Sequence, residues 1–571
     1  MSRSAITKIQ AVVIVVIIAL GVVSAAFYYN SIAKPPAQYK RTLTIAIPEE
    51  PESLDVQQAS WTSEVHDLIF QYTMNFDDKM NIVPDLAKAE FNGTAIVVHY
   101  AEDAKFSNGD PITAEALRDS MQRYSKLSVY GSDYDSVERV DIIDDHTARI
   151  VLKQLSTYVW WNDIPVNYGA IVDVKAAKQM GDAAFGEKPV GAGPFKAQEW
   201  VRGSHVVLVR NDLYKTNLPY VNNKGPNPYI DKVIVRFIPE DLTRLSEILA
   251  GNIEIMRGVP VDAVTKLRSN PDIVTHELLT PGIEYIMMNQ KVPPLDDVRV
   301  RQALNYAVNR SELAMTLDET VLPCYVYTSP SMLAYNASLA DYAASKYAYN
   351  PEKAKSLLEE AGWTMSSDGI FYKNGKPLSF TLLNPNDEPR FKRIGPLLQS
   401  QFAKVGVQIK VQEFTFSYIR SQTRSWKFEL ASRYYSWHDP AGILPYLLHS
   451  EMGNFTYSNP EADRLLEEDM NGALDPAARV ALYTKLQLMW LNDEPFVPLF
   501  VNREYTAVRK SVQGLVIPPP FGTQMVLNDV KVIAGTSQAI TPSLPLLITV
   551  ALFVNFGYIA ARKDSRVASR T

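Results

Sequence analysis

The sequence predicts an α/β fold with more than one lobe, on the basis of three observations. The chain has 571 residues, which is enough to build several hydrophobic cores. Segments with strand-like and helix-like patterns alternate along it, as they do in α/β proteins. The connections between these segments are irregular and contain many Pro, Asn and Gly residues. With 46% apolar and 21% charged residues, the composition is that of a folded chain and excludes a disordered one.

Short runs of β-branched and aromatic residues predict the strands. Leu43, Ile45 and Ile47 recur at every second position and form the first strand signal. The folded domain is therefore expected to start near residue 41, after a spacer that contains two consecutive prolines. Further strands are expected at residues 96–100, 206–209, 233–238 and 378–383.

Two helices are specified by their local chemistry. Residues 297–314 place apolar side chains at positions i, i+3, i+4, i+7 and i+8, and Asp297 puts negative charge at the expected start. This pattern predicts one amphipathic helix. Residues 350–362 begin with an Asn-Pro pair that suits the N-cap and the first helical position, and they end at Gly362, which suits a left-handed stop.

Both ends of the chain are strongly hydrophobic. Residues 1–33 include an uncharged stretch and are expected to be a secretory signal or an N-terminal membrane anchor. After a spacer at 532–543, residues 544–561 are expected to be a C-terminal transmembrane anchor. Lys and Arg residues flank both stretches on the side of the chain terminus, and positive charge marks the cytoplasmic side. The residues between the two stretches are therefore expected to lie outside the cell.

The start of the chain is similar to archaeal signals that are cut before their hydrophobic core, here after Ala5. Such a cut would leave the core attached to the mature protein as an anchor. A conventional cut after the core, near residues 24–26, is the alternative.

Composition and motifs argue against several classes of function. With 57 Lys and Arg against 63 Asp and Glu, the net charge is -6, so no basic surface for nucleic acid is expected. The single cysteine, Cys324, excludes an intramolecular disulfide. The sequence contains no His-Glu-x-x-His and no Gly-x-Ser-x-Gly motif, and its seven histidines are scattered. We therefore expect no enzyme activity, no catalytic residue, no metal site and no cofactor.

Six motifs occur in an order that resembles one family. They are FSNGDPITAEALRDSMQRY (106–124), PVGAGPFKAQEW (189–200), ILAGNIEI (248–255), PLDDVRVRQALNYAVNR (294–310), YAYNPEKAKSLLEEAGW (347–363) and WHDP (437–440). Together they resemble the extracytoplasmic solute-binding proteins of family 5, the peptide and nickel class, which feed ATP-driven importers. The resemblance covers roughly residues 41–531.

This resemblance implies a two-lobed clamp of the periplasmic-binding-protein type (type II, cluster C-like) with an extra inserted domain. Lobe I would combine residues 41–77, 188–279 and 490–531, the inserted domain would be 78–187, and lobe II would be 280–489. The implied partners are the permease and ATPase subunits of an ABC importer, and membrane lipid would contact the terminal anchors.

The resemblance also suggests residues that bind the ligand. Asp439 is the first choice for the ammonium group of a peptide, because the family carries such an aspartate in this region; the alternative is a turn cap before Pro440. Arg390 would bind a ligand carboxylate, as in some dipeptide-specific relatives, or it would be a solvated surface charge. The aromatic candidates, each of which could equally belong to a core, are Trp61, Tyr434, Tyr435 and Trp437.

The expected ligand is a peptide, with an oligosaccharide as the alternative. The chain has 30 Tyr and 8 Trp residues, and sugar-binding members of the family use aromatic platforms. Because a fold does not determine a function, an anchored hydrolase and a sensor remain further alternatives.

Overall fold

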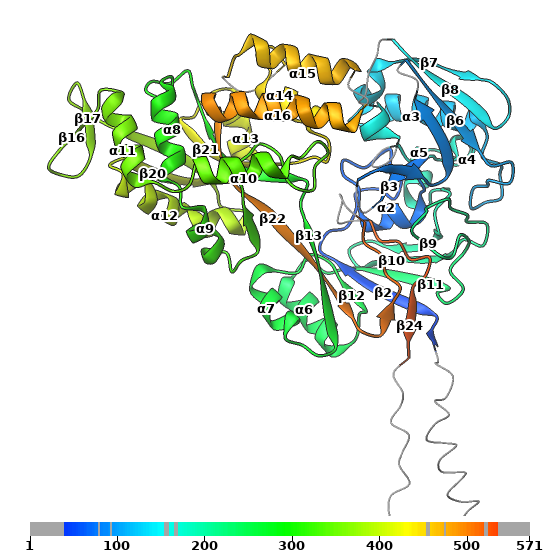
Figure 1. Ribbon diagram of the computed structural model, residues 1–571. Coiled ribbons are helices and arrows are strands. Elements are labelled where there is room, and N and C mark those ends of the chain that lie inside the picture. Colours follow the sequence, from blue (N-terminus) through cyan, green and yellow to red (C-terminus); the bar gives the residue numbers. More distant parts are fainter. Residues whose placement is uncertain are drawn as a thin grey trace, which may run out of the picture. The chain divides into compact units, whose positions relative to one another are not determined.

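Figure 1 shows the computed structural model of the chain. The structure describes residues 39–534, apart from 78–79, 92–93, 154–158, 165–168, 453–456, 473–474 and 519–523. Lys40–Val532 form one compact unit. The expected terminal membrane segments, 1–33 and 544–561, lie outside the described residues. Within the part that is described, no helix is both long enough and apolar enough to span a bilayer.

One long sheet connects the two lobes, and its central strand is β22 (Phe496–Arg509). On the lobe II side of β22 the strand order is β14 (Gly282–Met288), β21 (Leu430–Ser436), β19 (Ser379–Pro385) and β20 (Gln408–Phe414). On the lobe I side it is β12 (Ile255–Met256), β2 (Thr42–Ile47), β11 (Lys232–Phe237), β10 (His205–Arg210) and β9 (Phe195–Val201). Four of the five strands predicted from the sequence lie in this sheet and are confirmed, namely those at 43–47, 206–209, 233–238 and 378–383.

Strand β22 changes its partners half-way along its length. Its first half pairs with β14 and with β15 (Val321–Pro323), up to Asn502. From Arg503 onward it pairs with β13 (Ile273–Leu279), and further along also with β12. Figure 1 shows β22 passing from the lobe II strands to those of lobe I. A single strand is therefore part of both hydrogen-bonded networks.

Lobe I has a core formed by the buried faces of β2, β10 and β11. Leu43, Ile45 and Val235 are fully buried there. Its helices are α2 (Glu64–Ile69), α4 (Val174–Met180), α5 (Asp182–Glu187), α6 (Asp241–Ala250) and α7 (Val264–Arg268). A short antiparallel pair of β23 (Val512–Gln513) and β24 (Lys531–Ile533) follows the long sheet.

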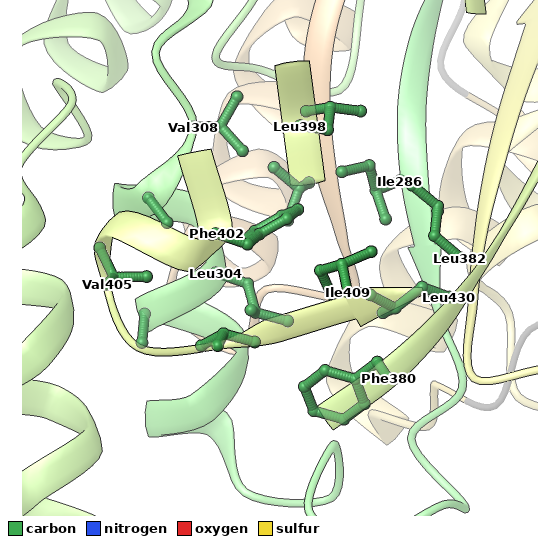
Figure 2. Close-up of a cluster of buried hydrophobic side chains, with 14 of the residues drawn as sticks. Ile286, Leu304, Val308, Phe380, Leu382, Leu398, Phe402, Val405, Ile409 and Leu430 are labelled. Carbon is green, nitrogen blue, oxygen red and sulfur yellow. The ribbon is translucent and has the colours of Figure 1, made fainter. Parts of the chain in front are cut away.

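Lobe II packs its helices against the sheet strands β14, β19, β20 and β21. Figure 2 shows part of this core, in which Leu304, Leu398 and Phe402 pack with side chains of the sheet. The helices are α8 (Val298–Ala307), α9 (Arg310–Thr316), α10 (Ala337–Lys346), α11 (Pro351–Glu360), α12 (Pro389–Lys404), α13 (Phe416–Arg424), α14 (Leu444–Leu448), α15 (Pro460–Gly472) and α16 (Pro476–Asp493). Burial of these apolar faces supplies the main stabilisation of the lobe.

The segment expected to be the inserted domain contains an antiparallel sheet with a helix packed on it. The strand order is β5 (Ala87–Phe91), β6 (Ala95–Tyr100), β8 (Thr147–Leu152) and β7 (Val137–Ile142). Helix α3 (Ala114–Leu127) buries Leu117, Met121 and Tyr124 in this core. The repeat of three to four residues along α3 is that of an amphipathic helix.

The prediction of one helix over 297–314 is wrong, because the segment contains two helices. Helix α8 ends at Ala307, and Val308 has an extended ψ of 115°. The Asn309 side chain then accepts a hydrogen bond from the Glu312 amide and caps α9. The helix predicted at 350–362 is confirmed, with Asn350 as its N-cap and a positive φ of 85° at Gly362.

Two of the expected domain boundaries differ from the observed packing. Residues of the range 170–185, including Val172 and Phe185, are buried in the lobe I core, although the sequence suggests that they belong to the inserted domain. Trp490 and Phe500 are buried in lobe II cores, although they fall in a segment expected in lobe I. The second difference arises because β22 starts in lobe II before it crosses.

Candidate ligand-binding site

A pocket of about 410 Å³ lies beside the point at which β22 changes partners. Its lining comes from segments far apart in the sequence and comprises Ile47, Pro48, Glu49, Trp61, Thr62, Glu64, Arg257, Gly258, Val259, Arg390, Arg503, Glu504 and Tyr505. Two of the residues predicted from the sequence, Trp61 and Arg390, therefore meet in one pocket. Pockets of this size, within the range of about 300–1,000 Å³, are typical of sites for small molecules.

The charges that line the pocket are balanced. Three are carboxylates and three are guanidinium groups: Glu49, Glu64, Glu504, Arg257, Arg390 and Arg503. Glu64 and Arg257 form a buried ion pair at 2.7 Å, and Arg257 also donates to the Thr506 hydroxyl. Arg503 pairs with Glu277 outside the lining. A pocket with both signs of charge favours a solute that carries both signs.

Glu284 is a buried residue of strand β14 that does not line the pocket. It stands in register with Tyr434 on β21 and with Phe500 on β22. Asn502 donates a hydrogen bond of 2.5 Å to Glu284 Oε1, whereas Glu284 Oε2 has no hydrogen-bond partner among the described residues. Burial raises the pKa of the Glu284 carboxyl to about 7, and the nearby positive charge of Arg390 opposes this shift.

Arg390 links the pocket to Glu284. It is in the first turn of α12, directly after Pro389, and is partly exposed. Among the described residues its Nε has no hydrogen-bond partner, and no ion pair within 4.0 Å holds its guanidinium. The same side chain lines the pocket and acts electrostatically on Glu284. Arg390 is therefore free to bind an anionic group, which the flat, forked guanidinium does well.

Tyr434 completes the group around Glu284. Its ring stacks on Phe416 with 4.6 Å between the ring centroids. Its hydroxyl is hydrogen-bonded to the Glu388 carboxylate, and burial together with that carboxylate raises the pKa of Tyr434 to about 12. Tyr434 thus lies next to the acidic residues, although it does not line the pocket itself.

Asp439 forms structural contacts inside lobe II. Its side chain is fully buried, and Oδ1 accepts hydrogen bonds from the Ala441 amide at 2.9 Å and from Arg479 Nη2 at 2.6 Å. Arg479 also binds Asp469, at 2.8 Å. Asp439 caps the turn before Pro440, which was the alternative interpretation, and it is also a buried ion-pair partner, which the sequence did not suggest. We therefore do not include Asp439 in the candidate site.

The two remaining aromatic candidates also lie away from the pocket. Tyr435 is buried, and its hydroxyl donates to the Tyr327 carbonyl in the lobe II core. Trp437 is partly exposed and packs so closely on Gly442 that a Cβ there would overlap its indole ring. Its backbone amide donates to the Pro281 carbonyl at 2.6 Å. Both side chains have structural contacts, and neither lines the pocket.

Sequence reasoning missed Glu284, Arg257 and Asn502. One signal was present for Glu284, since it is the only charged residue in the apolar run GIEYIMM, and every residue of that strand is buried. A charge in a fully buried strand requires compensation and so marks a site worth inspection. Arg257 and Asn502 had no local signal, because their partners are 193 and 218 residues away.

The described residues include no group of three or more His, Cys, Asp or Glu side chains that could hold a metal ion. Cys324 is buried, and because it is the only cysteine in the sequence it forms no intramolecular disulfide.

Comparison with known proteins identifies relatives of this fold. Residues 81–455 match the family described as bacterial extracellular solute-binding proteins, family 5 Middle. The oligopeptide-binding protein AppA of Bacillus subtilis is 27% identical over 475 residues, which cover 79% of this chain and 84% of the relative. The nickel-binding periplasmic protein of Escherichia coli is 25% identical over 492 residues, covering 81% and 89%. The solved structure of AppA with a nonapeptide has a TM-score of 0.66 at 23% identity and covers 87% of this chain and 100% of that one.

Proposed function

Because the chain belongs to the family 5 bacterial extracellular solute-binding proteins, we propose that it captures short peptides outside the cell for uptake by an ABC importer. Members of this family bind solutes for transport and are not enzymes, which agrees with the expectation that this chain has no enzyme activity. The permease and the ATPase that would receive the solute are part of the proposal. The relatives are named for different solutes, so we infer the ligand from the residues that line the pocket.

The observation that carries the proposal is the balanced charge of the pocket. A peptide with free ends is a zwitterion and requires a cation for its carboxylate and an anion for its ammonium group. Arg390, with no ion-pair partner among the described residues, suits the carboxylate. Trp61 and Tyr505 provide aromatic surface for a side chain of the ligand. An uncharged oligosaccharide could use the aromatic surface but would leave the charged groups without ligand partners.

The size of the pocket favours a short peptide. Its volume of about 410 Å³ is near the lower end of the range for small-molecule sites. We therefore propose a di- or tripeptide as the ligand. The nonapeptide bound by AppA is a property of that relative.

Clamp closure would couple binding to transport. Trp61 and Arg257 come from lobe I, whereas Arg390 comes from lobe II, and β22 connects the lobes beside them. A ligand that contacts both sides favours a closed conformation over an open one, because only the closed conformation makes both sets of contacts. The permease would then distinguish the loaded protein from the empty one.

The place of action is also part of the proposal. Family members are extracellular proteins. The apolar segments 1–33 and 544–561 would attach this one to the membrane, an inference that rests on their sequence alone. Membrane fractionation of cells that produce the full chain would test it, and recovery of the protein in the soluble fraction after cell breakage would contradict it.

Isothermal titration of the purified full chain with dialanine and trialanine tests the proposed ligand. We expect binding, and we expect Arg390→Gln to weaken it by about 1.5–3 kcal/mol, the scale of a charge-assisted hydrogen bond. Arg299→Gln is the matched control, since Arg299 is an exposed arginine of α8 that pairs with Asp297. Equal affinities of the wild-type and Arg390→Gln proteins would exclude Arg390 from the site.

A further inference from the structure

A buried cluster joins lobe II to lobe I and to the segment expected to be the inserted domain. Its apolar members are Phe76 of β3 (Met74–Phe76), Trp161 of the helical turn Val159–Asp163 and Leu333 of lobe II. Phe76 is fully buried, and Trp161 and Leu333 are 6% and 9% exposed. Among the described residues, no strand of lobe II pairs with β3 or with Val159–Asp163. The contact therefore depends on side chains and can separate without breaking a sheet.

His438 of lobe II is the polar member of this cluster. It follows the end of β21 and is fully buried. Its Nε2 donates a hydrogen bond to the Trp161 carbonyl at 2.9 Å, since a carbonyl can only accept. Its ring meets Phe76 edge-on, with 5.6 Å between the ring centroids. One side chain of lobe II thus contacts lobe I and the inserted segment at once.

The lobe II side of the contact is fixed by a buried network of charges. The Arg479 guanidinium lies over the Trp161 ring, 5.4 Å from its centroid, which is a favourable arrangement of a cation and an aromatic face. Arg479 is itself held by Asp439 at 2.6 Å and by Asp469 at 2.8 Å. Trp161 therefore meets a surface of lobe II whose side chains are already in place.

We propose that His438, Trp161 and Phe76 form a latch that holds the clamp closed. This role rests on the proposed function, because closure serves transport only if the clamp captures a solute. Opening of the clamp about β22 would separate Phe76 and Trp161 from His438, and water would replace the lost hydrogen bond. The latch adds contacts that only the closed conformation makes, so it favours closure whatever the solute is.

Acid should weaken the latch, because the closed clamp buries the His438 ring. Burial lowers the pKa of His438 to about 4; the Arg479 cation adds to this effect and the Asp439 carboxylate opposes it. Phe76 and Trp161, which contact His438 from the other side, carry no charge. In an open clamp the ring would meet water and regain its ordinary pKa of 6.5.

The pKa of His438 is thus lower in the closed clamp than in the open one. The closed conformation then loses stability as the pH falls from 6.5 toward 4. From the two pKa values, the ratio of closed to open molecules should fall by up to about 30-fold between pH 7.5 and pH 5.

The distance between two spin labels on the full chain tests the latch. The labels are attached to Lys126→Cys on α3 and to Ala478→Cys on α16, which are exposed positions on the two sides of the contact. Cys324 is buried and does not compete for the label. Pulsed electron paramagnetic resonance then measures the proportion of open molecules, with and without trialanine, and titration calorimetry measures the affinity for trialanine.

Four substitutions separate the parts of the latch. His438→Phe keeps the ring and removes the hydrogen bond, whereas His438→Gln keeps a donor and cannot be protonated. Phe76→Ala changes the opposite side, so the test does not depend on one lobe II variant folding. His99→Gln is the matched control, because His99 is an exposed histidine of β6. Circular dichroism checks that each variant is folded.

At pH 7.5 we expect more open molecules for His438→Phe and Phe76→Ala than for the wild type, and an affinity for trialanine about 10-fold lower, the effect of one lost hydrogen bond. At pH 5 the wild type should open and His438→Gln should not. His99→Gln should match the wild type at both pH values.

Two results would overturn the latch. One is an equal proportion of open molecules in the wild type, His438→Phe and Phe76→Ala. The other is an equal response to acid in the wild type and His438→Gln, which would remove the histidine from this role. If the distances change as expected but the wild type does not bind trialanine, the proposed ligand is wrong and the latch stands.

Discussion

Replacing Asp439 with Asn should destabilise lobe II without weakening the binding of solute. Asp439 and Arg479 are almost completely buried and meet at 2.6 Å. Asp439 Oδ1 accepts both hydrogen bonds, so the substitution keeps the acceptor and removes the negative charge that faces Arg479, and a hydrogen bond between charged groups is worth about 1.5–3 kcal/mol. The Asn side chain can still accept the hydrogen bond from the Ala441 amide, so the cap is preserved.

The expected loss lies near the lower end of this range, at about 1.5–2 kcal/mol. Arg479 is shared by two carboxylates, and the charge of Asp439 contributes to raising the pKa of Asp469. Removing one carboxylate relieves that repulsion and leaves a balanced pair of Arg479 and Asp469, at 2.8 Å. Arg479→Met is the contrasting variant, because it leaves two buried carboxylates without their cation and should cost about 3–5 kcal/mol.

Urea unfolding of the full chain, followed by a lobe II signal, measures these losses, and titration with trialanine measures binding. Asp439→Asn should lower the urea midpoint less than Arg479→Met does and leave the trialanine affinity unchanged. An affinity lowered tenfold or more at an unchanged midpoint would refute the reasoning, and Asp439 would then be a ligand residue, as its sequence context suggested.

Two further predictions concern stability. Burial raises the pKa of Glu284 from 4.5 to about 7, so folding favours its protonated form and the stability of the protein should fall as the pH rises from 4.5 to 7. Glu284→Gln should abolish up to about 3 kcal/mol of this fall. Thermal midpoints of both proteins at pH 5 and pH 8 measure the effect, and identical pH profiles of the two proteins would contradict it. Asn309→Ala removes the cap that starts α9 and should lower the free energy of unfolding by about 1 kcal/mol, whereas Asn309→Asp should retain most of the stability. Equal urea midpoints for Asn309→Ala and the wild type would count against a capping role.

The local signals in the sequence were sufficient for elements whose structure depends on near neighbours. The alternation at Leu43, Ile45 and Ile47 identified β2, and the Asn-Pro start with Gly362 at the end identified α11. The break between α8 and α9 was missed because the apolar repeat continues across it, while the capping preference of Asn309 outweighs helix propagation.

The candidate site was predictable only in part, because it is assembled by contacts between distant segments. Trp61 and Arg390, which the sequence analysis proposed as ligand-binding residues, line one pocket although they are more than 300 residues apart. Asp439 does not line this pocket, and nothing near it in the sequence indicates that Arg479, 40 residues later, would bind its carboxylate. The buried Glu284 Oε2, which has no hydrogen-bond partner among the described residues, can be recognised only in the structure.

The most direct test of the account is a calorimetric titration of the full chain with trialanine, N-acetyl-trialanine and an uncharged trisaccharide under the same conditions. The balanced charges that line the pocket, Arg390 among them, predict that trialanine binds most tightly, that N-acetylation weakens it and that the trisaccharide gives no heat of binding. Tight binding of the trisaccharide with no binding of trialanine would contradict the account.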